Sequence, residues 1–204
     1  MPTAEALGGG RQLGLIARQP RFIAAATCGA VSYMLMNFLM TAAPLAMHLC
    51  GHSQASANLG LQWHVIAMYA PSFFTGHLIA RFGAVRVAVA GLALTGLSAA
   101  VGLGGIEVMH FDGSLILLGL GWNLGFLGAS ALVLECHLPE EKTRVQSLND
   151  FIVFGVMAIG SFSSGGLLPA YGWNTVLWVS FLPLVLAAVA LALTVPKYKE
   201  SVLR

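Results

Sequence analysis

Charged residues are scarce in this chain. Asp, Glu, Lys and Arg make up 9% of its 204 residues, whereas an ordinary soluble domain has about 25%. Hydrophobic residues make up 57%, and the mean hydropathy is +0.81. These values exclude an ordinary soluble domain and indicate a protein of the lipid bilayer. The formal net charge of +2 is too small to indicate a nucleic-acid partner.

The sequence also lacks the patterns of several other protein classes. Its three cysteines give no disulfide framework, and residues 1–20 lack the apolar core of a signal peptide, so we interpret them as a cytoplasmic lead-in. There is no Ser/His/Asp arrangement in a suitable context, no phosphate-binding glycine loop and no HExxH motif. His48, Cys50 and His52 are close in sequence, but Gly51 interrupts the helix and no carboxylate is nearby. We therefore predict no enzyme activity, no cofactor and no metal site.

Six apolar runs are long enough to cross a bilayer as helices, which takes about 20 residues each. They predict an all-α membrane protein with a six-helix domain over residues 21–196 and a cytoplasmic tail over 197–204. The runs form two triplets whose first helices cross in opposite directions, which is typical of inverted repeats in transporters. Gly121 and Gly125 form a GxxxG pair, which favours close packing of the fourth helix. The six runs cover residues 22–49, 57–80, 85–106, 114–135, 148–169 and 173–195.

All basic residues lie on one side of these runs. The alternate loops, roughly 50–57, 107–113 and 170–173, contain no Lys or Arg. Because loops rich in Lys and Arg stay in the cytoplasm, both termini are predicted to be inside. The high content of Ala, Gly and Leu suggests a bacterium and hence the cytoplasmic (inner) membrane. The ten basic residues are Arg11, Arg18, Arg21, Arg81, Arg86, Lys142, Arg144, Lys197, Lys199 and Arg204.

Two asparagines are candidates for a solute site, because a polar side chain deep in a bilayer is costly and needs a partner or a purpose. Asn37 and Asn123 lie on the leading helix of each triplet, about 17 Å from its outer end and thus near the midplane. Transporters hold substrate at such repeat interfaces. Tyr33 precedes Asn37 by one helical turn, so both can face one cavity. The alternative is that each asparagine bonds a neighbouring helix and only fixes the packing.

Two interpretations stay open for Asp150. Either it carries a coupling proton within the bilayer, or it belongs to a capping box with Ser147 at the start of the fifth helix. In addition, Asp150 is a candidate for a cytoplasmic gate with Arg81 or Arg144 as its partner, and Glu135 is a candidate for the same charged cluster.

A second polar group lies near the outer end of the predicted second helix, at Gln62, Trp63 and His64. His64 has a side chain that titrates near neutral pH and is a candidate sensor of external acidity. The alternative, which the neighbouring tryptophan favours, is that the group anchors the helix at the membrane interface.

One loop resembles a motif of the major facilitator superfamily of secondary transporters. In that family, the loop between the second and third helices of a half reads Gly, three residues, an acid, a base, any residue, Gly, and then basic residues. Gly76, Arg81, Gly83 and Arg86 match this order, whereas the acidic position holds Ala80. This form is more typical of the family's C-terminal half. The substitution at Ala80 removes the carboxylate that a gating ion pair at that position would require.

Two further segments resemble the same family. Residues 171–173 (Tyr-Gly-Trp) resemble the start of the last helix of a half, and residues 139–144 resemble its other cytoplasmic loop. With the predicted topology, the resemblance covers residues 11–196. Because the family normally has twelve helices in two halves, the chain resembles a C-terminal half.

This resemblance implies a function and a partner. It implies a carrier half that moves a small solute through the lipid bilayer by alternating access, driven by a proton gradient or by the solute's own gradient. The partner would be a second six-helix half, either a separate N-terminal half or a second copy of this chain. The alternatives are a membrane scaffold or assembly protein that does not transport, and a truncated remnant of a twelve-helix transporter.

Overall fold

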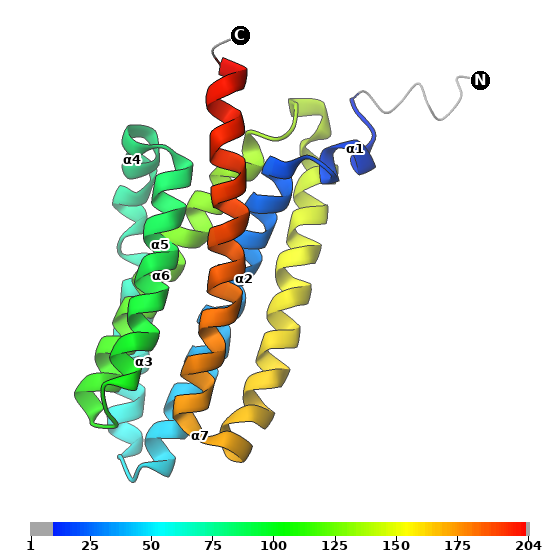
Figure 1. The fold of residues 1–204 in the computed structure, drawn as a ribbon. Helices are drawn as coiled ribbons and strands as arrows, with labels where there is room; N and C mark the ends of the chain where they lie inside the picture. Colours follow the sequence, from blue (N-terminus) through cyan, green and yellow to red (C-terminus); the bar gives the residue numbers. More distant parts are fainter. Residues whose placement is uncertain (1–9, 203–204) are drawn as a thin grey trace.

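The fold is a bundle of long helices (Figure 1). A computed structural model describes residues 10–202, and no strand occurs within that range. Residues 1–9 of the predicted lead-in and residues 203–204 of the predicted tail lie outside the described residues. The helices are α1 (Leu13–Ala17), α2 (Pro20–Leu49), α3 (Gln54–Tyr69), α4 (Ser72–Phe82), α5 (Ala84–Leu103), α6 (Val108–Leu134) and α7 (Lys142–Val202), the last preceded by the 3₁₀ turn η2 (Pro139–Glu141).

Four helical segments are long and apolar enough to span a membrane: α2, α5, α6 and Pro139–Thr194. Together with the absence of strands from the described range, they confirm the predicted all-helical membrane fold. Helix α2 lies at the centre, since 72% of its most apolar window is buried against 33% for Pro139–Thr194. It contacts α3, α5, α6 and α7. A helix that is apolar on all sides is suited to this central position.

Helix α7 consists of two limbs joined at Gly172. Figure 1 shows that the chain reverses its direction there, between the two limbs of α7. Gly172 has φ +80° and ψ 173°, a conformation that glycine adopts without the steric cost of a Cβ atom. The reversal falls between the predicted runs 148–169 and 173–195. The second limb continues to Val202, beyond the end predicted at residue 195.

The second predicted run, 57–80, is broken into two helices. Helix α3 ends at Tyr69, and α4 begins at Ser72 with the carbonyl of Pro71 accepting from the amides of Phe74 and Thr75 at 2.8 and 2.9 Å. Proline has no amide hydrogen and disfavours helical geometry in the residue before it. The structure accordingly interrupts the predicted run at Pro71.

The predicted capping box of Ser147 and Asp150 is wrong. Helix α7 already begins at Lys142, so both residues lie inside the helix, and Asp150 is exposed to the outside of the bundle. The helix starts earlier because another carboxylate, that of Glu141, supplies a hydrogen-bond acceptor in the turn before it. Glu141 accepts a hydrogen bond from the Leu138 amide at 2.9 Å, which supplies a partner for an amide that would otherwise have none at a helix start.

Helices α5 and α6 are in contact through their backbones. A Cβ atom on Gly121 would lie 2.5 Å from Oγ1 of Thr95, and one on Gly125 would lie 2.6 Å from Oγ of Ser32 on α2. A Cβ atom on Gly91 would overlap the backbone of Gly125. The GxxxG pair therefore lies in a tight interface, where small residues permit close approach in a bilayer.

Candidate functional site

Five aromatic side chains from four helices form one group, which we call the aromatic cluster: Tyr33, Tyr69, Trp122, Phe126 and Phe154. Trp122 and Phe126 stack with ring centroids 5.4 Å apart and an interplanar angle of 9°. Tyr33 meets three of the rings edge-on, at centroid distances of 5.6 Å from Trp122, 5.2 Å from Phe126 and 5.5 Å from Phe154. Both geometries are those that aromatic pairs prefer.

The aromatic cluster has a buried base and an exposed rim. Trp122 is 7% exposed, whereas Tyr69 is 59% exposed and Phe154 is 47% exposed. The buried side chains of Met36 and Met68 pack against Trp122. Nε1 of Trp122 is buried and has no hydrogen-bond partner among the described residues. The cluster therefore offers flat rings at its exposed rim, above a buried base.

The structure places Tyr33 and Asn37 together, on the side of α2 that faces α7. The ring of Tyr33 meets Phe154 of α7, and Nδ2 of Asn37 lies 2.8 Å from Sδ of Met157 on the same helix. Oγ1 of Thr41 donates to Oδ1 of Asn37 at 3.3 Å. Asn37 is half-buried at the edge of the aromatic cluster.

Asn123 lies elsewhere, at the interruption between α3 and α4. It is fully buried, and its Nδ2 donates to the carbonyl of Met68 and to Oγ of Ser72, both at 2.7 Å. Oγ1 of Thr75 donates to its Oδ1 at 2.5 Å. The Met68 carbonyl is in the last turn of α3, where carbonyls lose their intrahelical partners. Both ends of the Asn123 amide are thus used to hold the two short helices together.

The residues of the loop motif are separated from Asp150. Gly83 connects α4 to α5 with φ +85°, a value that favours glycine. The guanidinium of Arg81 lies 5.4 Å from the centroid of the Phe82 ring, and Gly76 and Arg86 are exposed. Asp150 contacts Asn149, whose Nδ2 is 3.4 Å from Oδ1. No ion pair joins Arg81 to Asp150 within residues 10–194, so the gate pair is not formed in this conformation.

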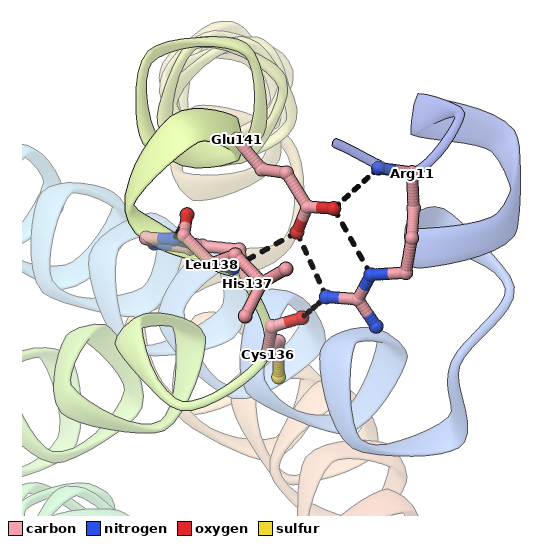
Figure 2. Close-up of polar contacts among 5 residues, drawn as sticks. All are labelled: Arg11, Cys136, His137, Leu138 and Glu141. Atoms are coloured by element: carbon pink, nitrogen blue, oxygen red, sulfur yellow. Dashed lines mark hydrogen bonds and ion pairs between the residues drawn. The ribbon is translucent and has the colours of Figure 1, made fainter. Parts of the chain in front are cut away.

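A charged contact that the sequence did not predict lies beside η2, and we call it the Arg11 clamp (Figure 2). Glu141 is completely enclosed, and its Oε1 accepts from the backbone N–H of Arg11 at 2.6 Å and from Nε of Arg11 at 3.0 Å. Nη2 of Arg11 donates to Oε2 at 2.8 Å and to the carbonyl of Cys136 at 3.1 Å. The clamp fastens the segment before α2 to the turn between α6 and α7.

The electrostatics of the Arg11 clamp keep it charged. The hydrogen bond to Glu141 raises the pKa of the Arg11 guanidinium above its ordinary value, partial burial opposes the rise, and attraction to the carboxylate adds to it. A second ion pair joins Arg21 to Glu135, so the latter does not join a cluster with Asp150. The two partners of the clamp are 130 positions apart in the chain, and no local pattern connects them.

Replacing Glu141 by glutamine is expected to release the segment 11–17 from the bundle. A glutamine amide has a single acceptor oxygen with two lone pairs, so it cannot accept all four hydrogen bonds that the Glu141 carboxylate accepts from Arg11 and Leu138, and it has no charge to pair with Arg11. We expect cleavage by trypsin after Arg18, which follows α1, to become several-fold faster in detergent micelles, because proteolysis follows local opening. The matched control is Glu140→Gln, since Glu140 is the exposed neighbour. Equal cleavage of the two variants would contradict the role of the clamp.

The described residues contain no group of three or more His, Cys, Asp or Glu side chains that could hold a metal ion. His52 instead bonds the carbonyl of Ile106 through Nε2 at 2.6 Å. The aromatic cluster and Asn37 combine partly exposed rings with a polar side chain, the kinds of group that bind small molecules.

Comparison with known proteins gives a consistent set of relatives. The sequence profile of the Major Facilitator Superfamily matches residues 25–203. The chain is 53% identical over 184 residues to the riboflavin transporter RfnT of Brucella anthropi, an alignment that covers 90% of this chain and 46% of that protein. It is 31% identical over 154 residues to the uncharacterized MFS-type transporter YddS of Bacillus subtilis, covering 74% of this chain and 35% of the relative.

A third relative is the 4-hydroxybenzoate transporter PcaK of Pseudomonas aeruginosa. It is 31% identical over 151 residues, which cover 73% of this chain and 34% of that protein. The chain thus spans less than half the length of the curated relatives it matches. No solved structure is significantly similar to it.

Proposed function

We propose a transport function from one premise: the chain belongs to the major facilitator superfamily. It is an integral multi-pass membrane protein, and its relatives are transporters. We propose that it forms one half of a carrier that moves a small aromatic solute, with riboflavin as the first candidate. The single observation that carries the solute class is the stacked pair Trp122 and Phe126, with Tyr33 edge-on to both.

The solute would bind by stacking on the exposed rim of the aromatic cluster. Riboflavin and 4-hydroxybenzoate, named for two relatives, both contain aromatic rings, and flat rings gain from offset stacking or edge contacts with aromatic side chains. Asn37 would donate or accept a hydrogen bond at the solute's polar edge. Asn123 would act indirectly, because its bonds hold the junction of α3 and α4 beside Trp122.

We further propose six membrane crossings in two inverted triplets. The interrupted pair α3 and α4 would form the second crossing, and the two limbs of α7 the fifth and sixth. Discontinuous helices beside a binding site are a feature of such repeats. The exposed rim of the aromatic cluster would face a second six-helix half, either a separate N-terminal half or a second copy. The basic loops would place both termini on the inner side of the bacterial cytoplasmic membrane.

Transport would proceed by alternating access, with the two halves rocking about the aromatic cluster, and would be coupled to protons. Arg81 and Asp150 would form their ion pair in a different conformation from the one described above. Arg86, Gly76 and Gly83 would belong to the loop that moves with them. The two short helices α3 and α4, held together by Asn123, supply a junction at which such movement is concentrated.

The test is uptake of labelled riboflavin by bacterial cells that cannot make it and that express the proposed carrier, with this chain as one half. We expect saturable uptake that unlabelled flavins compete away, and a clear loss of uptake in Tyr33→Ala and Asn37→Ala. Uptake no greater than in cells with an empty vector would reject riboflavin as the solute. A protein that performs its cellular role without any solute flux would favour the scaffold alternative. Labelling of residues 51–56 in intact cells by an impermeant reagent tests the proposed orientation.

A further inference from the structure

His64 is a buried histidine within an apolar helix bundle. Its side chain is 0% exposed, whereas the adjacent Trp63 is 47% exposed. An interfacial anchor, the alternative that we favoured for both residues, therefore suits Trp63 only. An ionisable side chain inside a membrane domain is costly and usually serves a function.

The hydrogen bond of His64 fixes which ring nitrogen carries the proton. Nδ1 lies 2.7 Å from the carbonyl oxygen of Leu115 on α6. A carbonyl oxygen only accepts, so Nδ1 is the donor, and in the neutral ring Nε2 keeps a bare lone pair. No described residue makes a hydrogen bond to Nε2. The ring thus presents one unused, basic nitrogen inside the protein.

A carboxylate lies on the neighbouring helix, one turn before the partner of His64. Asp112 precedes Leu115 by three positions on α6, so the two residues share a face of that helix. Its Oδ1 is buried and has no partner among the described residues. A Cβ atom on Gly60, one turn before His64 on α3, would lie 2.8 Å from this oxygen. The two helices therefore bring Asp112 and His64 to neighbouring levels of one interface.

Few other charges face this interface. Helix α3 packs against α6 and α2. From α6, His110 is directed toward Gly105, where a Cβ atom would lie 2.7 Å from its ring. Helix α2 has no Asp, Glu, Lys, Arg or His between Arg21 and His48, and residues 54–69 of α3 have no charged residue. Asp112 is therefore the carboxylate that meets α3 at this interface, one helical turn from His64.

We propose that Nε2 of His64 binds the coupling proton of transport, with Asp112 attracting that proton from the end of the bundle that we place outside. This inference rests on the proposed function and names its coupling site. A proton from outside adds to Nε2 and makes an imidazolium, while the hydrogen bond from Nδ1 to the Leu115 carbonyl remains. The same proton then leaves Nε2 toward the inside, which restores the neutral ring.

The position of His64 connects the proton to the solute site. Met68 follows His64 by one helical turn, its side chain packs against Trp122, and its carbonyl accepts from Asn123. A Cβ atom on Gly119 of α6 would lie 2.6 Å from the carbonyl oxygen of His64, so the two helices touch at this level. A positive charge on the His64 ring changes how α3 packs against α6. The aromatic cluster lies one helical turn further along this interface, at Met68 and Trp122.

The first test compares His64→Gln with His77→Gln, a matched change at an exposed histidine, in the proposed carrier reconstituted in proteoliposomes. Labelled riboflavin is followed in exchange without a gradient and in accumulation driven by a pH gradient. One pH unit is a tenfold difference in proton activity, so wild type that moves one proton inward with each solute molecule is expected to accumulate solute by about tenfold per unit. We expect His64→Gln to keep exchange and lose accumulation, and His77→Gln to keep both. Accumulation by His64→Gln equal to wild type would overturn the proposal.

The second test detects the proton on His64 directly. It therefore tests the proposal even if the His64→Gln variant also loses exchange. Wild-type protein with ¹⁵N-labelled histidine is titrated by NMR in detergent, and the His64 signals are identified by their absence in His64→Gln. We expect Nε2 to be bare at high pH and to gain a proton on acidification, with Asp112→Asn moving the midpoint to lower pH. An Nε2 that carries hydrogen throughout, or a midpoint that Asp112→Asn does not move, would overturn the proposal. Lack of any riboflavin exchange by wild type would instead reject the proposed function.

Discussion

Replacing Gly91 by alanine is expected to destabilise the protein, whereas the same change at Gly96 on the same helix is not. A Cβ atom on Gly91 would overlap the backbone of Gly125 and lie 2.7 Å from the carbonyl oxygen of Gly121. Backbone atoms within a helix cannot rotate away as a side chain can, so α5 and α6 must separate. Overpacking of this kind costs about 1–3 kcal/mol or more. At Gly96 the nearest atom would be Cδ1 of Leu184 at 3.8 Å, which is ordinary contact.

Comparing Gly91→Ala with Gly96→Ala separates the effect of packing on stability from the effect of helix propensity. Alanine is favoured over glycine within a helix by about 1 kcal/mol, so propensity alone predicts that both variants are more stable than wild type. Thermal unfolding in detergent, followed by the fraction of monodisperse protein on size-exclusion chromatography, measures the outcome. We expect the midpoint to fall by several degrees for Gly91→Ala and to stay level or rise for Gly96→Ala. A rise for both would contradict the backbone contact between α5 and α6.

Replacing Trp122 by alanine is expected to weaken riboflavin binding by more than tenfold. Trp122 stacks on Phe126, meets Tyr33 and Tyr69 edge-on, and is largely buried. Buried aromatic anchors at a binding site typically contribute about 2 kcal/mol or more, and about 1.4 kcal/mol corresponds to a factor of ten. Quenching of riboflavin fluorescence on binding to the detergent-solubilised protein gives the affinity directly.

Two companion variants separate binding from folding. Trp122→Phe keeps a ring against Phe126 and is expected to retain part of the affinity, while Trp178→Ala removes a tryptophan that is 65% exposed on the second limb of α7. The latter should bind riboflavin as wild type does. If Trp122→Ala binds normally, the aromatic cluster is a packing feature and the solute site lies elsewhere.

The sequence was sufficient for features that depend on local pattern. Apolar runs predicted the all-helical membrane fold because a bilayer requires continuous apolar helices. One glycine of each of two family motifs lies at a turn: Gly83 and Gly172 both have positive φ. Gly121 and Gly125 lie in a helix interface, as the GxxxG spacing predicts. Each of these features is fixed by residues within one or two helical turns of one another.

Features that depend on distant contacts could not be predicted in this way. The Arg11 clamp joins two positions in different parts of the chain, and its carboxylate begins α7 before the capping box that we expected at Ser147. Asn123 was grouped with Asn37 by its depth and by its place on the leading helix of a triplet, whereas its hydrogen bonds are to α3 and α4. The spacing of Trp122 and Phe126 at i and i+4 was the available signal for the aromatic cluster, but its other members come from three further helices.

The Arg11 clamp has a consequence for anything joined upstream of this residue. Because Arg11 is fastened to the turn before α7 by both its backbone and its side chain, an attached polypeptide starts from a fixed point at one end of the bundle. A tether anchored in this way raises the effective concentration of whatever it carries near that end, to about millimolar for a short flexible connection. A fluorescent reporter joined upstream of Arg11 would therefore stay close to the turn between α6 and α7.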